Sequence, residues 1–179
     1  MTDSRTIFIT GADKGLGYAL AKTFLREGFI VFAGLYDQDS DLSDLNANDG
    51  MLYEIPLDVS QMESIKTAAK MVKETGHQLD ILLNNAGIYL KEECLRPPLE
   101  EETLDDGRIE AMMAVNAYGP IRMIQQFLPL MKIDGLKKLT TISSEAGSIA
   151  ECWRDSEISY CMSKGALNRG LQIIHHYLS

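Results

Sequence analysis

Cysteine and histidine are scarce in this chain, which has three residues of each among its 179. Cys94, Cys152 and Cys161 are widely spaced and form no C-x-x-C pair, so a zinc site and a redox-active dithiol are both disfavoured. The histidines show no metal-ligand spacing. We therefore expect free thiols, a reducing and hence cytoplasmic location, and no metal.

Long hydrophobic runs and an excess of positive charge are also missing. No run reaches the roughly 18 apolar residues of a membrane-spanning helix. The first five residues resemble no secretory signal, and we expect none. The chain has 17 basic and 26 acidic residues, a net charge of -9, which disfavours nucleic acid and anionic membranes as partners. With 45% hydrophobic residues, residues 1–179 are predicted to form a single domain that binds a small molecule.

Strands and helices are predicted to alternate. Short apolar runs of the kind that lie buried in parallel sheets are found at residues 6–9, 29–34, 51–57, 79–83 and 138–143. Helices are predicted at residues 15–27, from Ser60 to 76, and at 104–131 and 158–178. Ser60 is the expected N-cap of the second helix, with Glu63 completing a capping box. The alternation predicts an α/β fold, a doubly wound, Rossmann-like parallel sheet with five strands.

Three glycines follow the first predicted strand, in the segment T-G-A-D-K-G-L-G of residues 10–17. Glycine allows a sharp turn and lets a pyrophosphate approach the N-terminus of a helix. The spacing G-x-x-x-G-x-G differs from the usual dinucleotide fingerprint, and many α/β proteins need a glycine turn for steric reasons alone. Its place directly after the first strand nevertheless favours dinucleotide binding.

Polar residues follow two further predicted strands. Asp58 comes after the third strand and Asn84–Gly87 after the fourth. Ligands of open α/β sheets bind outside the carboxyl ends of the strands, so we expect these residues to face the same crevice as the glycine turn. The alternative is that Asp58 only caps a helix and the asparagines only turn the chain. The expected Ser60 cap argues against the first part of that alternative.

Tyr160 and Lys164 lie four residues apart, on one face of the last predicted helix. An ammonium group beside a phenol favours the phenolate and makes the tyrosine usable in acid–base catalysis. Such a pair also arises by chance on solvated helices, so it has weight only together with other motifs.

Asn116 is a polar residue on an apolar helical stripe with Ile109, Met112 and Met113. Pro120 lacks an N–H group and cannot donate to the Asn116 carbonyl. Because buried polar groups need partners, two interpretations remain. The free carbonyl holds a water molecule, or the helix is kinked and the asparagine has a purely structural partner.

Together these motifs resemble the short-chain dehydrogenase/reductase family, in the family's order along the whole chain. They are Thr10, Gly11, Gly15, Gly17, Asp58, Val59, Asn84–Gly87, Val115, Asn116, Ile142–Ser144, Tyr160 and Lys164. Lys14 is similar to a residue of the carbonyl-reductase-like and bacterial members. The resemblance implies an oxidoreductase that moves hydride between NAD(P)H and a carbonyl/alcohol substrate. The alternative is a catalytically weak nucleotide-binding protein that acts through association.

The resemblance also implies individual roles. Tyr160 would exchange a proton with the substrate oxygen, and Lys164 would make that phenol more acidic and hold the nicotinamide ribose. Ser144 would bind the substrate oxygen, Ser143 being expected as buried packing, and Asn116 would hold a water of a proton relay. The implied cofactor contacts are Gly11, Asp13, Lys14, Gly15, Leu16, Gly17, Asp58, Val59, Asn85, Ala86, Gly87, Tyr160 and Lys164.

The expected cofactor is NADP rather than NAD. By resemblance, Leu35 stands where NAD-binding members place an acid, and Tyr36 stands where arginine is common. Lys14 matches a basic position of NADP-binding members. Asp37, one position late for the ribose acid, keeps NAD as the alternative.

The sequence departs from the family pattern in two places. Ser144 and Tyr160 are 16 positions apart, which suggests an enlarged loop with Cys152 and Trp153 over the site, or else a surface excursion. Family members usually continue with two further strands and a substrate-covering segment. We therefore expect this sequence to belong to a longer chain, with the fifth strand at a sheet edge.

A homo-oligomer, either a dimer or a tetramer, is expected because the family commonly pairs its last two helices of this region. Apolar residues suited to such an interface are Ile121, Ile124, Leu128, Leu171 and Ile174. The alternative is that these residues belong to the core.

Overall fold

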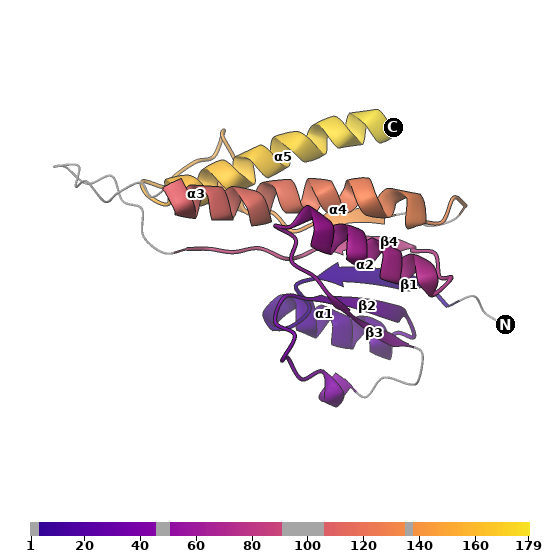
Figure 1. Ribbon diagram of the computed structural model, residues 1–179. Coiled ribbons are helices and arrows are strands. Elements are labelled where there is room, and N and C mark those ends of the chain that lie inside the picture. Colours follow the sequence, from indigo (N-terminus) through magenta and orange to yellow (C-terminus); the bar gives the residue numbers. More distant parts are fainter. Residues whose placement is uncertain (1–3, 46–50, 91–105, 135–137) are drawn as a thin grey trace. The chain divides into compact units, whose positions relative to one another are not determined.

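The computed structural model describes residues 4–45, 51–90, 106–134 and 138–179. Its strands are β1 (Thr6–Thr10), β2 (Ile30–Leu35), β3 (Leu52–Pro56), β4 (Ile81–Asn84) and β5 (Lys138–Thr141), and its helices are α1 (Gly15–Arg26), α2 (Met62–Glu74), α3 (Asp106–Met112), α4 (Gly119–Phe127) and α5 (Ile158–Leu178) (Figure 1). Two compact units are distinguishable, one of Met1–Ala86 with Arg122–Ile142 and one of Gly87–Ile121 with Ser143–Ser179. The single domain expected from the sequence stays a prediction.

The first unit contains a five-stranded parallel sheet in the order β3-β2-β1-β4-β5. β1 lies at its centre, where Phe8 pairs with Phe32 of β2 on one side and with Leu82 of β4 on the other. The chain extends the sheet first in one direction from β1 and then in the other, so the switch point lies between β1 and β4. This order confirms the predicted doubly wound, Rossmann-like α/β fold, with β5 at an edge.

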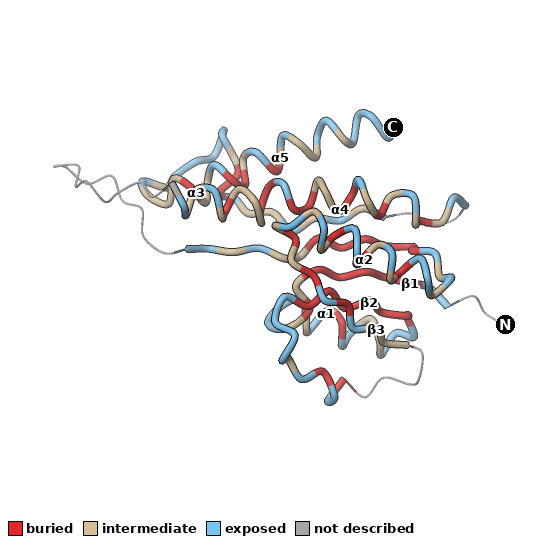
Figure 2. The backbone as a smooth tube through the Cα atoms, viewed as in Figure 1, coloured by how far each residue is buried: buried red, intermediate tan, exposed pale blue. Residues whose placement is uncertain are grey.

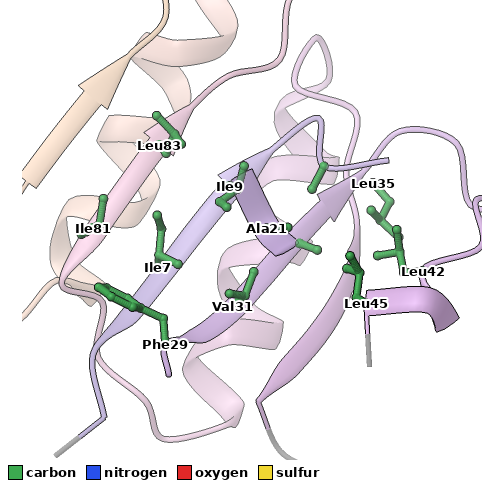
Figure 3. Close-up of a cluster of buried hydrophobic side chains, with 12 residues drawn as sticks. Ile7, Ile9, Ala21, Phe29, Val31, Leu35, Leu42, Leu45, Ile81 and Leu83 are labelled. Atoms are coloured by element: carbon green, nitrogen blue, oxygen red, sulfur yellow. The ribbon is translucent and has the colours of Figure 1, made fainter. Parts of the chain in front are cut away.

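Both faces of β1 are covered within this unit. Ile7 and Ile9 belong to a buried cluster that includes Ala21 of α1 (Figure 3). Phe8 points to the opposite face, because successive side chains of a strand alternate. Its ring centre lies 4.6 Å from that of Phe127 in α4. β1 and β2 are buried along their whole length (Figure 2), which explains why they are unbroken apolar runs in the sequence.

Part of the long helix predicted at residues 104–131 has a different geometry in the structure. Between α3 and α4, residues Met113–Tyr118 form a π-helical segment, and the N–H of Gly119 bonds the carbonyl of Ala114, five residues earlier. Pro120 follows directly, and a regular α-helical ladder cannot continue through a residue without an N–H group. The predicted helical stretch is therefore interrupted by a π-helical segment just before Pro120, and residues 104–105 lie outside the described part.

The capping box predicted for α2 is also wrong. Gln61, not Ser60, is the N-cap, and no side chain caps this helix. The hydroxyl and the N–H of Ser60 instead donate to Asp58 Oδ1 at 2.7 and 2.8 Å. Glu63 pairs with Lys66 at 2.7 Å. A local turn closed by the Asp58 carboxylate thus takes the hydroxyl that the box required, and the Ser60 argument against a local role for Asp58 no longer holds.

The remaining predicted elements differ only at their ends. β4 begins at Ile81, because Leu79 forms only an isolated bridge with Met131. The predicted helix at 158–178 matches α5. Cys152 and Cys161 are free thiols, whereas Cys94 lies outside the described residues. Among the described helices, none combines the length and apolarity needed to cross a membrane.

Asp80 joins three chain segments at the amino-terminal edge of the sheet. Its Oδ2 accepts the N–H of Thr6 at 2.7 Å and lies 3.1 Å from Lys132 Nζ. The Asp80 side chain is only 7% exposed. Its charge is therefore largely removed from water and compensated by these neighbours.

We predict that Asp80→Ala lowers the free energy of unfolding by about 3–5 kcal/mol, because it leaves Lys132 and the Thr6 N–H without their buried acceptor. Urea unfolding followed by circular dichroism measures the loss. Glu63→Ala, which breaks the exposed pair with Lys66, is the control and should have a small effect. Equal losses in both variants would contradict the assignment.

Candidate functional site

The turn after β1 is formed by glycines that no other residue could replace without strain. Gly11 and Gly15 have φ values of 66° and 58°, in the left-handed region that favours glycine. A Cβ at Gly17 would lie 2.0 Å from the carbonyl oxygen of Gly11. The start of α1 therefore approaches the turn more closely than any side chain allows. The N–H of Ala12 ties the turn to Gly34 of β2 at 2.9 Å.

Asn85, directly after β4, holds this turn. Its Nδ2 donates to the carbonyls of Thr10 and Gly11 at 2.9 and 3.1 Å. In return, Thr10 Oγ1 accepts the N–H groups of Asn85 and Ala86 at 3.0 and 2.9 Å. The predicted neighbourhood of the glycine turn and the fourth strand end is thus present within the first unit. The amide nitrogen of Asn85 serves the turn itself.

The N-terminus of α1 suits an anion. Lys14 is its N-cap, no side chain caps it, and its first turn carries no acidic residue. Gly15 and Leu16 are exposed there. First-turn N–H groups together with the helix dipole attract phosphate. A glycine cradle in front of such a helix fits the pyrophosphate of a dinucleotide.

The neighbouring charged and polar positions differ in exposure. Lys14 is 83% exposed, and its Nζ lies 4.0 Å from Asp13, whose side chain is 5% exposed. At the end of β2, Leu35 is buried and Tyr36 is 70% exposed. Of the residues after β3, Val59 is buried, and the Asp58 carboxylate is engaged by Ser60 as described above.

We predict that Gly17→Ala lowers the free energy of unfolding by about 1–3 kcal/mol, because the added methyl group overlaps the Gly11 carbonyl and the Asn85 amide. Denaturant titration measures the change. Gly165→Ala is the matched control, since the nearest atom to its Cβ is 4.0 Å away, and should stabilise α5 by up to about 1 kcal/mol. A Gly17→Ala protein as stable as the wild type would refute the close-approach argument.

In the second unit, α5 carries the predicted Tyr160–Lys164 pair. Lys164 Nζ lies 5.9 Å from the centre of the Tyr160 ring. Lys164 is only 5% exposed, and this burial lowers the pKa of its ammonium group below that of an exposed lysine.

Asn168 is a residue that the sequence reasoning missed. It continues the face of Tyr160 and Lys164 by one further turn, and this i, i+4, i+8 spacing was the available signal. Its Oδ1 accepts the Ser143 hydroxyl at 2.6 Å, and its Nδ2 donates to the Gly147 carbonyl at 3.1 Å. Ser143 was expected to be buried packing. It is instead half-buried, and its hydrogen bond to Asn168 anchors its turn to α5.

Ser144 begins a short 3-10 turn, Glu145–Gly147. Its hydroxyl donates to Glu145 Oε2 at 2.6 Å and accepts the N–H of Ala146 at 3.1 Å. The hydrogen bond from Ser144, followed by that from Arg154, lowers the pKa of Glu145 to about 2. Glu145 is thus a carboxylate at any physiological pH. It accepts the hydrogen bond from the hydroxyl of Ser144, the candidate catalytic serine.

Asn116 lies in the π-helical segment and is 1% exposed. Its side chain exchanges two hydrogen bonds with the backbone of Ile88, both at 2.8 Å. Its Nδ2 also donates to Ser163 Oγ at 3.1 Å, and Ser163 donates to the Tyr160 carbonyl at 2.7 Å. The side chain therefore has the structural partners foreseen in one of the two interpretations. It also connects this segment to the helix that carries Tyr160.

Two side chains from outside α5 lie near Tyr160: Arg154, from the segment before α5, and Tyr89, from the segment after β4. Arg154 Cζ lies 6.0 Å from the centre of the Tyr160 ring, and the Tyr89 ring meets that ring edge-on at 5.2 Å. Trp153 is 75% exposed, and Cys152 is exposed as well.

The predicted site residues divide between the two units. The four candidate catalytic residues Asn116, Ser144, Tyr160 and Lys164 all belong to the second, together with Gly87. The other cofactor candidates, at residues 11–17, 58, 59, 85 and 86, belong to the first. Among the described residues, no group of acids, histidines or cysteines has the arrangement of a metal site.

A sequence profile described as short chain dehydrogenase matches residues 5–177. The chain belongs to the short-chain dehydrogenase family. It is 37% identical over 167 residues to a short-chain dehydrogenase of Penicillium crustosum, covering 92% of this chain and 57% of that protein. It is 31% identical over 163 residues to the (+)-neomenthol dehydrogenase of Arabidopsis thaliana, covering 81% of this chain and 55% of that one.

Solved short-chain dehydrogenase structures share the fold. The NADPH-bound carbonyl reductase from chicken fatty liver superposes with a TM-score of 0.79 at 29% identity, covering 93% of this chain and 68% of that one. A putative short-chain alcohol dehydrogenase from Burkholderia multivorans gives 0.80 at 28% identity, covering 95% and 76%. The chain thus spans less than two thirds of the length of the first curated relatives it matches, 57% of two of them and 64% of a third.

Proposed function

We propose that this member of the short-chain dehydrogenase family is an NAD(P)-dependent oxidoreductase acting on a carbonyl/alcohol pair. The observation that supports it most is the buried Lys164, with its Nζ 5.9 Å from the centre of the Tyr160 ring. Asn116 and Ser144 belong to the same compact unit. A buried ammonium beside a phenol is expensive to maintain in a purely structural role, and family membership supplies its use in catalysis.

The glycine turn after β1 indicates where the cofactor binds in this proposal. When bound, the nicotinamide supplies or accepts the hydride. The turn of Gly11, Gly15 and Gly17 holds the pyrophosphate at the N-terminus of α1, while Asn85 keeps the turn in shape. The remaining cofactor contacts in this proposal come from Asp13, Leu16, Asp58, Val59, Ala86 and Gly87. Tyr160 and Lys164 hold the nicotinamide ribose.

The proposed chemistry uses the phenol of Tyr160. During reduction the Tyr160 hydroxyl gives its proton to the substrate oxygen, and during oxidation its phenolate takes that proton back. The Ser144 hydroxyl, which donates to Glu145 Oε2 in the structure, turns to donate its proton to the same oxygen when substrate binds. Lys164 favours the phenolate and passes protons onward, which its lowered pKa assists. Asn116 holds the water at the far end of this relay.

We predict that Tyr160→Phe lowers kcat by a factor on the order of 10² to 10⁴, because it removes the proton donor and little else. Lys164→Met should lower kcat and also weaken cofactor binding, since it removes the ribose contact. The measurements are NADPH oxidation by the natural protein with a carbonyl panel that includes benzaldehyde and cyclohexanone, and the cofactor Kd by fluorescence.

Near-normal turnover in Tyr160→Phe, when chemistry limits the rate, would overturn this mechanism. The alternative of a catalytically weak nucleotide-binding protein would then be preferred. An unchanged cofactor Kd and circular dichroism spectrum in Tyr160→Phe serve as its control.

We further propose NADP as the preferred cofactor, with the 83% exposed Lys14 pairing with the 2′-phosphate. The buried, uncharged Leu35 at the end of β2 offers no acid for an NAD ribose. The chicken relative, whose structure holds NADPH, supports the same choice.

Lys14→Ala should weaken NADPH binding by about 1 to 2 kcal/mol while leaving NADH binding nearly unchanged, because only NADPH has the 2′-phosphate. Titration of both cofactors against both proteins measures the difference. Equal losses for the two cofactors would refute the pairing.

A homo-oligomer is proposed as well, with a small-molecule carbonyl or alcohol as the substrate. Part of the apolar surface considered for an interface lies within the chain. Ile124 is 4% exposed, and Ile121 packs against Gly170 of α5. On α5, Ile173 and Tyr177 are 58% and 86% exposed and add to the apolar surface that a partner subunit could cover.

A further inference from the structure

Arg154 lies in the segment between Ser144 and Tyr160 and joins two carboxylates from the two ends of that segment, Glu145 and Glu157. Its Nε donates to Glu145 Oε1 at 3.0 Å, and its Nη2 reaches the same oxygen. Its Nη1 pairs with Glu157 Oε2. The Arg154 side chain is 20% exposed, whereas the Glu145 side chain is 51% exposed. One planar group thus holds two carboxylates at a fixed separation.

Each carboxylate is linked to one of two candidate catalytic residues, Glu145 to Ser144 and Glu157 to Tyr160. Glu145 uses its other oxygen to accept the Ser144 hydroxyl at 2.6 Å. Glu157 uses its other oxygen to accept the hydroxyl of Tyr89, whose ring lies edge-on to Tyr160 at 5.2 Å. A chain of contacts therefore runs from Ser144 through Arg154 to the ring of Tyr160.

The backbone of Glu157 shows that this arrangement is held in place. Its φ is 65°, the only positive value at a non-glycine residue among the described residues. Such a conformation persists only where neighbouring contacts enforce it. Glu157 is also the N-cap of α5, and its carbonyl accepts the N–H of Cys161 at 2.9 Å. Glu157, which pairs with Arg154, thus sets the start of the helical turn that carries Tyr160.

We propose that Arg154 is a positioning residue, which rests on the proposed function. Its guanidinium holds Glu145 and Glu157 together and so fixes the Ser144 side chain and the Tyr160 phenol in one arrangement around the substrate oxygen. From this arrangement the Ser144 hydroxyl turns its proton from Glu145 to that oxygen when substrate binds. Arg154 also neutralises two carboxylates that would otherwise oppose the negative charge developing on that oxygen.

The test is Arg154→Met, alone and combined with Tyr160→Phe, in the NADPH oxidation assay with benzaldehyde and cyclohexanone. We expect the single variant to lose kcat on the order of 10²-fold, the usual effect of a small misplacement of reacting groups, with the NADPH Kd unchanged. In the Tyr160→Phe background the same substitution should change kcat less than threefold, because residues that act as a unit are not additive. Arg154→Lys should recover part of the loss, since an ammonium can pair with one carboxylate but not span both.

Arg169→Met is the matched control. Arg169 is an exposed arginine of α5 that contacts Gln172, and its loss should leave kcat unchanged. A fully additive effect of Arg154→Met and Tyr160→Phe would overturn the proposal, as would a normal kcat in Arg154→Met. So would unfolding of both Arg154→Met and Arg154→Lys by circular dichroism, because Arg154 would then serve the fold alone. Failure of the proposed function is recognised separately, because the Tyr160→Phe single variant would then keep a near-normal kcat.

Discussion

The hydrogen bonds from Asn85 to the carbonyls of Thr10 and Gly11 are the interaction on which the edge of the first unit depends. They join the ends of β1 and β4, the two strands on either side of the switch point. A single amide can satisfy both carbonyls only because Gly17 leaves no side chain in its way, since a Cβ there would lie 2.6 Å from Asn85 Nδ2. The open N-terminus of α1, and with it the proposed phosphate site, follows from that arrangement.

A comparable constraint organises the second unit around α5. Gly147 approaches the Lys164 carbonyl so closely that a Cβ there would lie 2.7 Å from it. Asn168 secures the same turn through Ser143 and Gly147. On the same helix, Ser163 receives Asn116 from the π-helical segment. Two other parts of the chain, residues 143–147 and Asn116, thereby contact the helix that bears Tyr160 and Lys164.

Much of the fold was predictable, because strands buried on both faces are unbroken apolar runs. The failures have local causes. Ser60 looked like a cap by residue type, yet the Asp58 carboxylate, two residues earlier, accepts its hydroxyl. Pro120 signalled a disturbed helix, but its position could not specify that the disturbance takes the form of a π-helical segment before it.

The sequence by itself determined the order of the elements, the glycine turn and the Tyr160–Lys164 pair, since each depends on residue types at short, regular spacing. Only the tertiary structure decided what each polar side chain contacts. Asn85 holds the glycine turn, Asn116 grips the backbone of Ile88, and Ser144 donates to a Glu145 that Arg154 restrains. The physical reason is that a hydrogen bond depends on distance and direction in space, and residues 28 or 75 positions apart acquire these only when the chain has folded.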